Sequence, residues 1–379
     1  RVNSSVLSLY DNNRLKSPSI KGAETTWATI DNRLGKELKA AKSVRVLTGS
    51  IISPSTQASI DLFLGESTEE NGLDNKHVVA DAISYSGILD ANAASFGKAV
   101  IPTYNFEKAK TIVSVGADYM GSWLDALQYV NDYTQTRKPS NDWMSKTFQF
   151  EASMSLTGTN TDVRVPVKPS EYGAIISSLY KHLGGKGGVS TPYDSKVIEA
   201  AAALKASKGE SIVVCGSNDK NVQVLVNAIN ELLGNYGKTI DLNIVSNSKQ
   251  GLDSEVSTLI SDMNAGKVDA LLIHGIDPVF TMGDAFTNAM KKVTTTVSFA
   301  NKMNDTSAAC IYVCPSNHAL ESWSDAVPVT GHYSLGQPTI SPLFDTRQTE
   351  ESLLKWSGID SSYHDYIQNY CKENIFPKS

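Results

Sequence analysis

Two stretches of the sequence decide the fold: TIVSVGADYMGSWLDAL at Thr111–Leu127 and ALLIHGIDPVFTMGDAF at Ala270–Phe286. Each begins with a β-branched apolar run that is typical of a strand buried on both faces, and each continues with Gly-x-Asp and a helical pattern. In both copies a second strand ends near Met-x-x-Thr, and a third ends in proline before a polar helix start. Corresponding residues are 159, 149 and 146 positions apart: Gly116 and Gly275, Met154 and Met303, Pro169 and Pro315. This internal repeat predicts two related α/β domains.

Strand and helix patterns alternate along most of the chain. The predicted strands are Val44–Thr48, His77–Ala80, Thr111–Val115, Lys146–Glu151, Val163–Lys168, Ser211–Cys215, Leu242–Val245, Ala270–His274, Thr295–Phe299 and Cys310–Cys314. The predicted helices are Trp27–Ala41, Ser55–Leu64, Glu171–Leu183, Lys196–Ser207, Asn221–Leu233 and Ser254–Ala265. This alternation indicates right-handed βαβ units and an α/β fold.

The composition excludes several classes of protein. The chain has 379 residues and a formal net charge of −6, so it offers no broadly basic surface and we expect no nucleic-acid partner. Its apolar runs are shorter than the roughly 20 residues of a membrane-spanning helix. Four cysteines are too few for a disulfide framework and lack the C-x-x-C-x-x-x-C spacing of cluster ligands. Because the sequence opens at Arg1 without a methionine or signal peptide, we expect a segment of a longer protein.

The two Gly-x-Asp turns are the first candidate binding residues. Gly116 with Asp118, and Gly275 with Asp277, follow buried strands and precede helices. Backbone amides in such turns bind phosphate, and a carboxylate accepts bonds from a ribose or a base edge. The same pattern is typical of a tight turn with an N-capping aspartate, and spacing alone favours that interpretation. We identify no catalytic residue and no set of metal ligands from the residues themselves.

Several motifs, taken together, resemble the molybdopterin oxidoreductases of the DMSO-reductase superfamily. The passage Leu9–Pro18 (LYDNNRLKSP) is similar to the family's "LYdpdRLk-P", and Val115–Trp123 (VGADYMGSW) is similar to "fGAdfLgtW". Phe150–Gly158 (FEASMSLTG) and Pro166–Pro169 resemble "fe-rmSlTG" and "lPvrPG", while Asn317–Pro328 resembles the later "eTa-yAD-vLP" segment. The resemblance implies Rossmann-like parallel-sheet domains of the formate dehydrogenase/DMSO reductase type, one inserted in the other. We expect residues 1–90 with 205–350 to form the first domain, 91–204 the second, and 351–379 a C-terminal helical segment.

Within that superfamily the sequence looks most like the large iron–sulfur subunit of alternative complex III. The stretches SVLSLYD (Ser5–Asp11), MSLTGTNTD (Met154–Asp162) and HYSLGQPTISPLFDTRQTEE (His332–Glu351) carry this similarity. It implies a bacterial protein that is exported by the Tat route to the periplasmic face of the inner membrane. The implied partners are the cluster-binding region of the same subunit and the cytochrome and membrane subunits of a respiratory complex. Iron–sulfur clusters would lie only in parts of the protein that this sequence does not include.

The sequence departs from the family at the positions that hold the cofactor. Where the family places its molybdenum ligand, the candidates here are Ser84 and Ser86, with no cysteine. The arginine of the family's "DPR" position is replaced by Ser153, which removes a cation suited to pyrophosphate. Glu171 stands at the position of an aspartate that would hold a guanine edge, although at a helix start it also complements the helix dipole.

These departures predict a cofactor-free, non-catalytic scaffold domain of a quinol-oxidising electron-transfer complex. Two alternatives stay open. One is an active oxidoreductase fragment in which Gly116, Asp118, Glu171, Gly275 and Asp277 bind molybdopterin guanine dinucleotide and Ser84 or Ser86 binds molybdenum. The other is a periplasmic binding module with two α/β lobes around a cleft.

Overall fold

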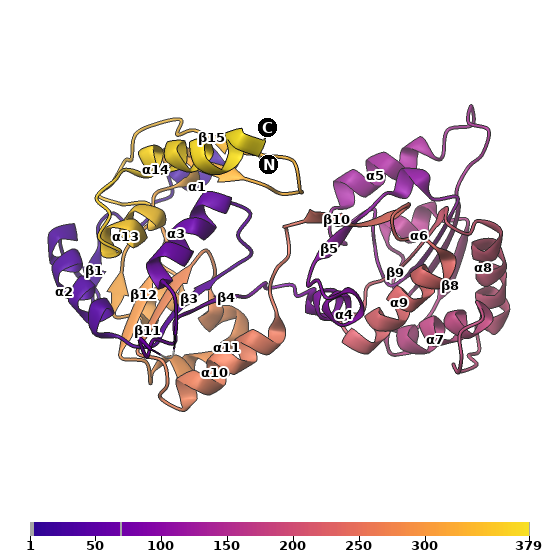
Figure 1. Cartoon of the computed structure of the whole chain (residues 1–379), viewed down its shortest axis with the longest axis horizontal. Helices are drawn as coiled ribbons and strands as arrows, with labels where there is room; N and C mark the ends of the chain where they lie inside the picture. Colours follow the sequence, from indigo (N-terminus) through magenta and orange to yellow (C-terminus); the bar gives the residue numbers. More distant parts are fainter. Residues whose placement is uncertain (1–3, 69, 379) are drawn as a thin grey trace. The chain divides into compact units, whose positions relative to one another are not determined.

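The computed structural model describes residues 4–68 and 70–378. The chain divides into two compact units, Arg1–Ile83 with Gln250–Ser379 (unit 1) and Ser84–Lys249 (unit 2). Unit 2 is therefore an insertion into unit 1, and each unit is an α/β structure (Figure 1). No helix in the described part of the chain is long and apolar enough to cross a membrane.

Unit 1 is built on a mainly parallel sheet with strand order β2-β1-β13-β12-β11-β3-β4. Strands β13, β12, β11, β3 and β4 run parallel, and β1 adds to β13 antiparallel. The strands are β1 (Ser19–Ile20), β2 (Ala23–Glu24), β3 (Val44–Thr48), β4 (Lys76–Val79), β11 (Ala270–His274), β12 (Thr295–Ser298) and β13 (Tyr312–Val313), with the separate hairpin β14 (Ser324–Ala326) and β15 (Ser334–Gly336).

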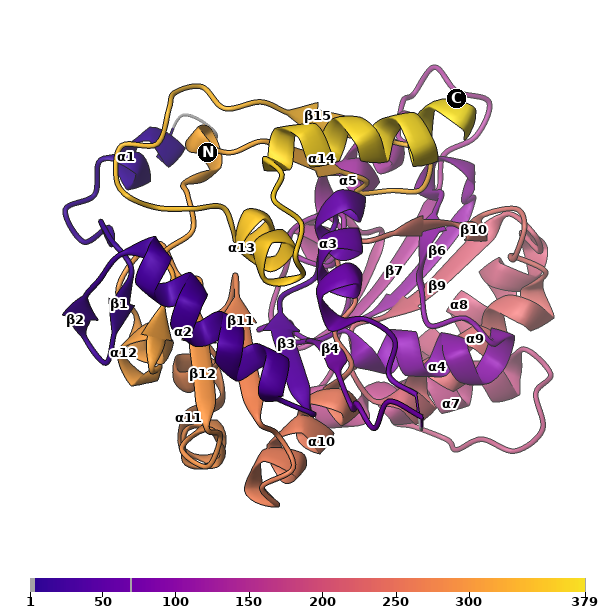
Figure 2. The same cartoon turned by 60° about the vertical axis from the view of Figure 1, so that its left-hand side comes forward.

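Helices cover both faces of the unit 1 sheet. The α-helices are α1 (Ser5–Leu9), α2 (Trp27–Ala40), α3 (Pro54–Leu64), α10 (Asp253–Asn264), α11 (Pro278–Met290), α12 (Asp305–Ala309), α13 (Thr349–Trp356) and α14 (Tyr363–Tyr370). The short turns η4 (Ala319–Glu321), η5 (Cys371–Ile375) and η6 (Phe376–Lys378) complete the unit. Helices α2, α3 and α13 cover one face, and α10 and α11 cover the other (Figure 2). Their apolar side chains form two separate clusters with the side chains of the sheet. This two-sided burial explains why β11 begins with a continuous apolar run and why every residue of β3 is buried, including Arg45, which pairs with Asp74.

Unit 2 repeats the central part of this design. Its parallel sheet has the order β8-β7-β6-β9. The strands are β5 (Ile101–Tyr104), β6 (Thr111–Val115), β7 (Lys146–Glu151), β8 (Val163–Pro166), β9 (Ser211–Cys215) and β10 (Ile240–Ser246). The helices are α4 (Ser86–Phe96), η2 (Phe106–Lys108), α5 (Ala126–Gln135), α6 (Leu156–Asn160), η3 (Pro169–Glu171), α7 (Tyr172–His182), α8 (Asp194–Ala206) and α9 (Lys220–Leu233). Strands β5 and β10 pair with each other antiparallel.

The sheet orders show how the two units correspond. The order β8-β7-β6-β9 in unit 2 matches β13-β12-β11-β3 in unit 1, so the repeated strands β6 and β11 occupy equivalent places. The fourth strand differs in origin, because β9 follows the repeat along the chain whereas β3 precedes it. The repeat read from the sequence is thus present in the sheet topology.

The unit boundaries differ from those expected from the sequence. Residues 205–249, which we assigned to the first domain, lie in unit 2 because β9 pairs in parallel with β6 from Thr111↔Ser211 to Val115↔Cys215. Residues 351–379 do not form a separate segment, since Leu353 and Trp356 pack into the unit 1 core. The chain passes between the units at 83/84 and 249/250. The glycine-rich loop Gly184–Gly188 is not one of these crossings, because it lies inside unit 2 between α7 and α8.

The two places where the chain leaves and re-enters unit 1 are tied together by Asp81. Its carboxylate accepts hydrogen bonds from the backbone amides of Gln250 (3.2 Å) and Gly251 (3.0 Å) and from the hydroxyl of Ser50 (2.9 Å). A side chain at Gly251 would meet the backbone of residues 79–81, so this approach requires glycine. The ends of the insertion are therefore held side by side.

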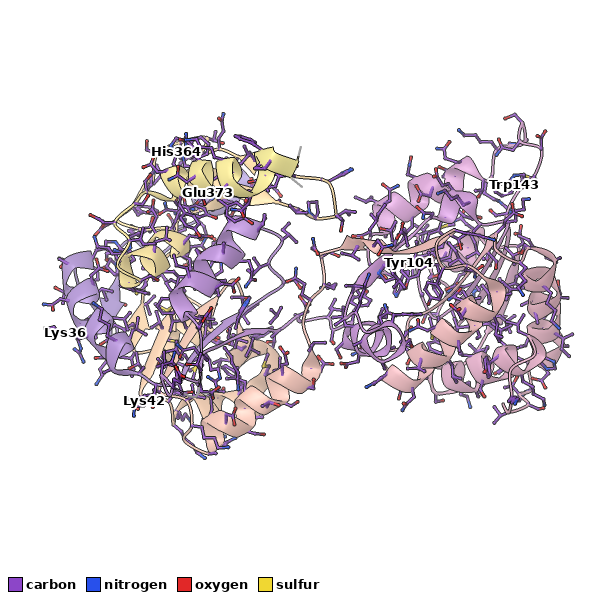
Figure 3. All side chains as sticks on the ribbon, viewed as in Figure 1. Lys36, Lys42, Tyr104, Trp143, His364 and Glu373 are labelled. Atoms are coloured by element: carbon purple, nitrogen blue, oxygen red, sulfur yellow. The ribbon has the colours of Figure 1, made fainter. Side chains whose placement is uncertain are left out.

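The face of the unit 2 sheet opposite α7, α8 and α9 is covered by aromatic rings. Tyr104, Phe106, Tyr119, Trp123 and Tyr129 are each less than 9% exposed. Phe106 stacks on Tyr119 with ring centroids 4.6 Å apart, and Tyr104 lies 5.3 Å from Trp123. Figure 3 labels Tyr104 inside unit 2 and Trp143 on the connection before β7. Aromatic layers of this kind bury large areas with defined ring geometry.

Candidate functional site

Both Gly-x-Asp turns lie at the carboxyl end of the corresponding strand in their unit. Gly116 follows β6 with φ +69°, and Gly275 follows β11 with φ +73°. This left-handed conformation is one that only glycine adopts readily, so each motif glycine is required by its turn. The carboxyl edge of a parallel sheet is where ligands bind in open α/β folds.

In unit 2 the carboxylate of Asp118 is bound by the next strand connection. It accepts hydrogen bonds from the backbone amide (3.0 Å) and the hydroxyl (2.8 Å) of Thr157. The same hydroxyl accepts a bond from the Met120 amide (3.0 Å), two residues beyond the aspartate. Thr157 is 1% exposed. Asp118 thus fastens the turn after β6 to the start of α6.

Unit 1 repeats this arrangement bond for bond. Asp277 accepts from the backbone amide (3.1 Å) and hydroxyl (2.5 Å) of Thr306, and the hydroxyl accepts from the Val279 amide (3.1 Å). Asp277 also caps α11, because its side chain accepts from the Phe280 amide. The sequence showed the Gly-x-Asp and Met-x-x-Thr motifs in both copies but did not predict that they bind each other. The Met-x-x-Thr motif, present in both copies, was the signal that pointed to Thr157 and Thr306.

We predict that Thr157→Val and Thr306→Val each lower the free energy of unfolding by about 1–3 kcal/mol. Valine keeps the shape of threonine but leaves the Met120 or Val279 amide without its acceptor and removes one of the donors to the aspartate. Urea unfolding followed by tryptophan fluorescence measures both effects. Thr159→Val is the matched control, since the Thr159 hydroxyl is exposed and only returns to the Ser155 carbonyl. A loss no larger than that of the control would contradict the structural role of these threonines.

Glu171 is engaged in a local capping turn. Its carboxylate accepts from the Lys168 backbone amide (2.9 Å) and from the Tyr193 hydroxyl (2.9 Å). The hydrogen bond from the Lys168 amide, followed by that from Tyr193, lowers the pKa of Glu171 below its usual value. The carboxylate is thus partnered within the chain, and its role toward a guanine edge stays a prediction.

Ser84 and Ser86 lie at the start of α4. The Ser84 hydroxyl oxygen accepts from the Ser86 backbone amide (3.1 Å) and from the side-chain amide of Asn218 (3.2 Å). Ser86 is 4% exposed. The glycine that follows, Gly87, donates its amide to Asn218 (2.8 Å) and lies so close to the Asn218 backbone that a side chain would overlap it. This serine pair therefore helps to hold α4 against the chain after β9.

The turn at Gly116 does not fit a bound pyrophosphate. The Gly116 amide already donates to the Phe150 carbonyl (2.7 Å), and a methyl group on Gly116 would overlap the Tyr172 ring. Strand β8, which pairs with β7, carries Arg164, whose guanidinium is paired with the buried carboxylate of Glu151 at 2.5 Å. A pyrophosphate requires free amides and uncompensated cations. We therefore derive no chemistry through a dinucleotide in unit 2.

The turn at Gly275 is more open. Gly275 is exposed, and a methyl group there would meet nothing within 4 Å. Among the described residues, no backbone carbonyl accepts from its amide. Lys302 stands at the repeat position of Ser153, 149 residues further on. Its ammonium group forms an ion pair with Asp11 at 2.5 Å, so the charge of this lysine is already neutralised within the chain.

The four cysteines are buried thiols. Cys215, Cys310, Cys314 and Cys371 are free and buried. Burial raises the pKa of Cys215, Cys310 and Cys314 to about 12, so these three thiols stay protonated near neutral pH. Within residues 4–68 and 70–378, His, Cys, Asp and Glu side chains form no group of three or more that is placed to hold a metal ion.

A large hollow of unit 1 lies at the opposite edge of its sheet. It has a volume of about 610 Å³ and is lined by Lys21, Arg33, Lys42, Asp269 and Thr295 among others. Lys42 precedes β3 and Thr295 begins β12, so this hollow faces the amino ends of the strands. Figure 3 labels Lys42 there and Lys36 on α2. The hollow is thus separate from the Gly-x-Asp turns.

The chain is similar in sequence to a known protein. No family model matches the chain. The menaquinone reductase molybdopterin-binding-like subunit of Nitratidesulfovibrio vulgaris (strain Hildenborough) is 23% identical over 406 aligned positions, which cover 92% of this chain. The chain spans 58% of the length of that relative.

Solved structures give the same fold. Acetylene hydratase from Pelobacter acetylenicus matches with a TM-score of 0.66 at 11% identity, over 94% of this chain and 63% of that one. A chain of the formyltransferase/hydrolase complex from Methylorubrum extorquens, solved with methylofuran, matches with a TM-score of 0.59 at 12% identity. That match covers 93% of this chain and 99% of the other. The predicted fold class, paired parallel-sheet α/β units of the DMSO reductase type, is confirmed. In sequence the chain is similar to a molybdopterin-binding-like subunit.

Proposed function

We propose that this chain is a cofactor-free scaffold of a quinone-linked respiratory complex. The observation that carries the proposal is that the carboxylates of the candidate site already have hydrogen-bond partners within the chain. Thr157 and Thr306 bind the carboxylates of Asp118 and Asp277, while Lys168 and Tyr193 bind that of Glu171. Groups that would recognise a dinucleotide are thereby used to hold the chain itself together.

The name of the relative supports the respiratory setting. It is a molybdopterin-binding-like subunit of a menaquinone reductase, and its similarity extends over 92% of this chain. We propose that the present chain likewise acts within a multisubunit complex, as the large subunit region of alternative complex III at the periplasmic face. Its role there is to contact the cluster-binding region and the cytochrome and membrane subunits.

Metal and pterin analysis tests the absence of the cofactor. The full chain is expressed in a host that synthesises molybdenum cofactor, and molybdenum per chain and fluorescence of the oxidised pterin are measured. We expect both to stay far below one equivalent, whereas a molybdenum enzyme from the same host gives about one equivalent. Stoichiometric molybdenum or pterin would overturn the scaffold and favour the active oxidoreductase fragment.

Co-purification tests the assembly. A tagged chain isolated from membranes of its own organism under mild detergent is expected to bring cytochrome and cluster-bearing subunits with it. Isolation of the chain alone, at the amounts at which it is expressed, would contradict the role in a complex and favour the binding module.

A further inference from the structure

Tyr172 fills the space over the Gly-x-Asp turn of unit 2. It is the first residue of α7, and its ring lies against the backbone of Gly116. A methyl group built on Gly116 would come within 2.6 Å of Cζ and 2.9 Å of Cδ2 of the ring, closer than real contacts allow. The ring therefore occupies the volume that a side chain, or a ligand, would take above this turn.

The ring also contacts the neighbouring strand ends. The apolar part of Tyr172 packs against the core that includes Val115, Phe150 and Cys215, the residues that end or nearly end β6, β7 and β9. A single side chain thus spans the carboxyl edge of the unit 2 sheet.

The backbone that follows β9 also lies close to Gly116. A methyl group on Gly216, the residue after β9, would meet the Gly116 carbonyl and lie 2.7 Å from its carbon atom. Gly116 is thus in close contact with both this glycine and the Tyr172 ring. The crevice that ligands use in open α/β sheets is therefore taken up by the protein.

Unit 1 lacks this arrangement. By the repeat offset of 146 positions, the residue that corresponds to Tyr172 is His318. The His318 ring caps η4 by accepting from the Leu320 amide and contacts the Ser8 hydroxyl at 2.8 Å. Nothing lies within 4 Å of a methyl group placed on Gly275. The repeats share their Asp–Thr bonds, but a ring covers the motif glycine only in unit 2.

We propose that Tyr172 is a built-in occupant of the unit 2 crevice, a phenol ring that replaces a bound ligand and holds the ends of β6 and β7 together. This inference rests on the proposed function, because it explains what supports the strand ends of a scaffold that binds no dinucleotide. It implies that removing the ring creates a binding site for a small phenol.

Chemical rescue tests the proposal on the full chain. Tyr172→Ala is expected to lower the Tm by roughly 5–10 °C, since a large partly buried ring is lost. Millimolar 4-methylphenol, which matches the missing side chain, is expected to restore at least a third of this loss, as cavities left by truncated apolar side chains bind matching rings. Tyr172→Phe, which keeps the ring, should lose no more than about 3 °C.

Tyr193→Ala is the matched control. Tyr193 packs against the same core and binds Glu171 through its hydroxyl, but it does not cover a glycine of the sheet edge. Its Tm should fall without being restored by 4-methylphenol. If 4-methylphenol raises the Tm of Tyr172→Ala no more than that of Tyr193→Ala, the proposal is wrong. Should Tyr172→Ala not fold, Tyr172→Leu is compared in the same way.

The same samples separate this inference from the proposed function. Molybdenum or pterin in the wild-type chain would overturn the scaffold. A wild-type chain without either, combined with failure of the phenol rescue, would overturn only the role of Tyr172. GDP is the comparison ligand, and we expect it to leave the Tm of Tyr172→Ala unchanged, because the Gly116 amide and the Asp118 carboxylate remain bound within the chain.

Discussion

Replacing Glu321 with alanine is expected to lower the free energy of unfolding by about 3–5 kcal/mol. Glu321 and Arg14 form a bidentate ion pair at 2.7 and 3.0 Å, and both side chains are 0% exposed. Loss of the carboxylate leaves the buried guanidinium without its counter-charge. It also removes the acceptor of the His318 and Leu343 amides.

The pH dependence of the protein's stability follows from the same ion pair between Arg14 and Glu321. Desolvation opposes ionisation of Glu321, but the hydrogen bonds from Arg14 and the two amides outweigh it, so its pKa lies below the usual value. A carboxylate with a lowered folded-state pKa stabilises the protein above its unfolded-state pKa. That contribution is lost as the pH falls through the folded-state pKa. The wild-type chain should therefore lose more stability in acid than the double variant Arg14→Met/Glu321→Leu.

Urea unfolding at neutral and acid pH measures both effects. Glu199→Ala is the control, because Glu199 pairs with Lys196 on an exposed helix surface and its loss should cost at most about 1 kcal/mol. The apolar double variant should be more stable than Glu321→Ala, since it leaves no unpaired charge. Equal losses for Glu321→Ala and Glu199→Ala would show that the Arg14 pair is solvated.

Gly216→Ala is expected to cost about 3 kcal/mol, at the upper end for overpacking. The added methyl group would overlap the Gly116 carbonyl, and both partners are backbone. The ends of β6 and β9 would have to separate, since no rotamer relieves the clash. Gly116 is also in close contact with the Tyr172 ring, which further restricts how its backbone can move.

Gly35→Ala serves as the control for this substitution. Gly35 lies in the middle of α2, where a methyl group meets nothing within 4 Å. It should stabilise the chain by up to about 1 kcal/mol, because alanine is the better helix former. Urea unfolding measures the free energy of unfolding of both variants. Hydrogen exchange of the backbone amides in β6 and β9 shows whether the loss of stability lies at these two strands. A Gly216→Ala variant as stable as the wild type would contradict the close approach of the two strand ends.

The sequence predicted the central strands well because their burial is two-sided. Val44–Thr48, Thr111–Val115 and Ser211–Cys215 have the predicted bounds, and each is buried along its whole length. Short antiparallel strands such as β1 and β14 were not predicted. Each has only two or three residues, which is too short for a recognisable local pattern. Each is defined by its pairing with another strand.

The site was predictable as a set of motifs but not as a set of contacts. Asp118 and Asp277 were identified, yet their bonds to Thr157 and Thr306 depend on the register of β7 and β12 beside β6 and β11. Tyr172 carried no signal, since its ring position is set by where α7 begins relative to the sheet edge. The narrower resemblance to alternative complex III and the periplasmic location stay proposals.

The tie made by Asp81 has a consequence for the order of folding. Strand β3 must pair with β11, which lies more than 200 residues further along the chain. The entropy cost of closing a flexible loop grows with its length, so this pairing is slow while the intervening chain is unfolded. Once unit 2 has folded and Asp81 joins Gln250 and Gly251, the same connection acts as a short turn. We therefore expect unit 2 to fold before the unit 1 sheet, whose strands β3 and β11 precede and follow it in the sequence.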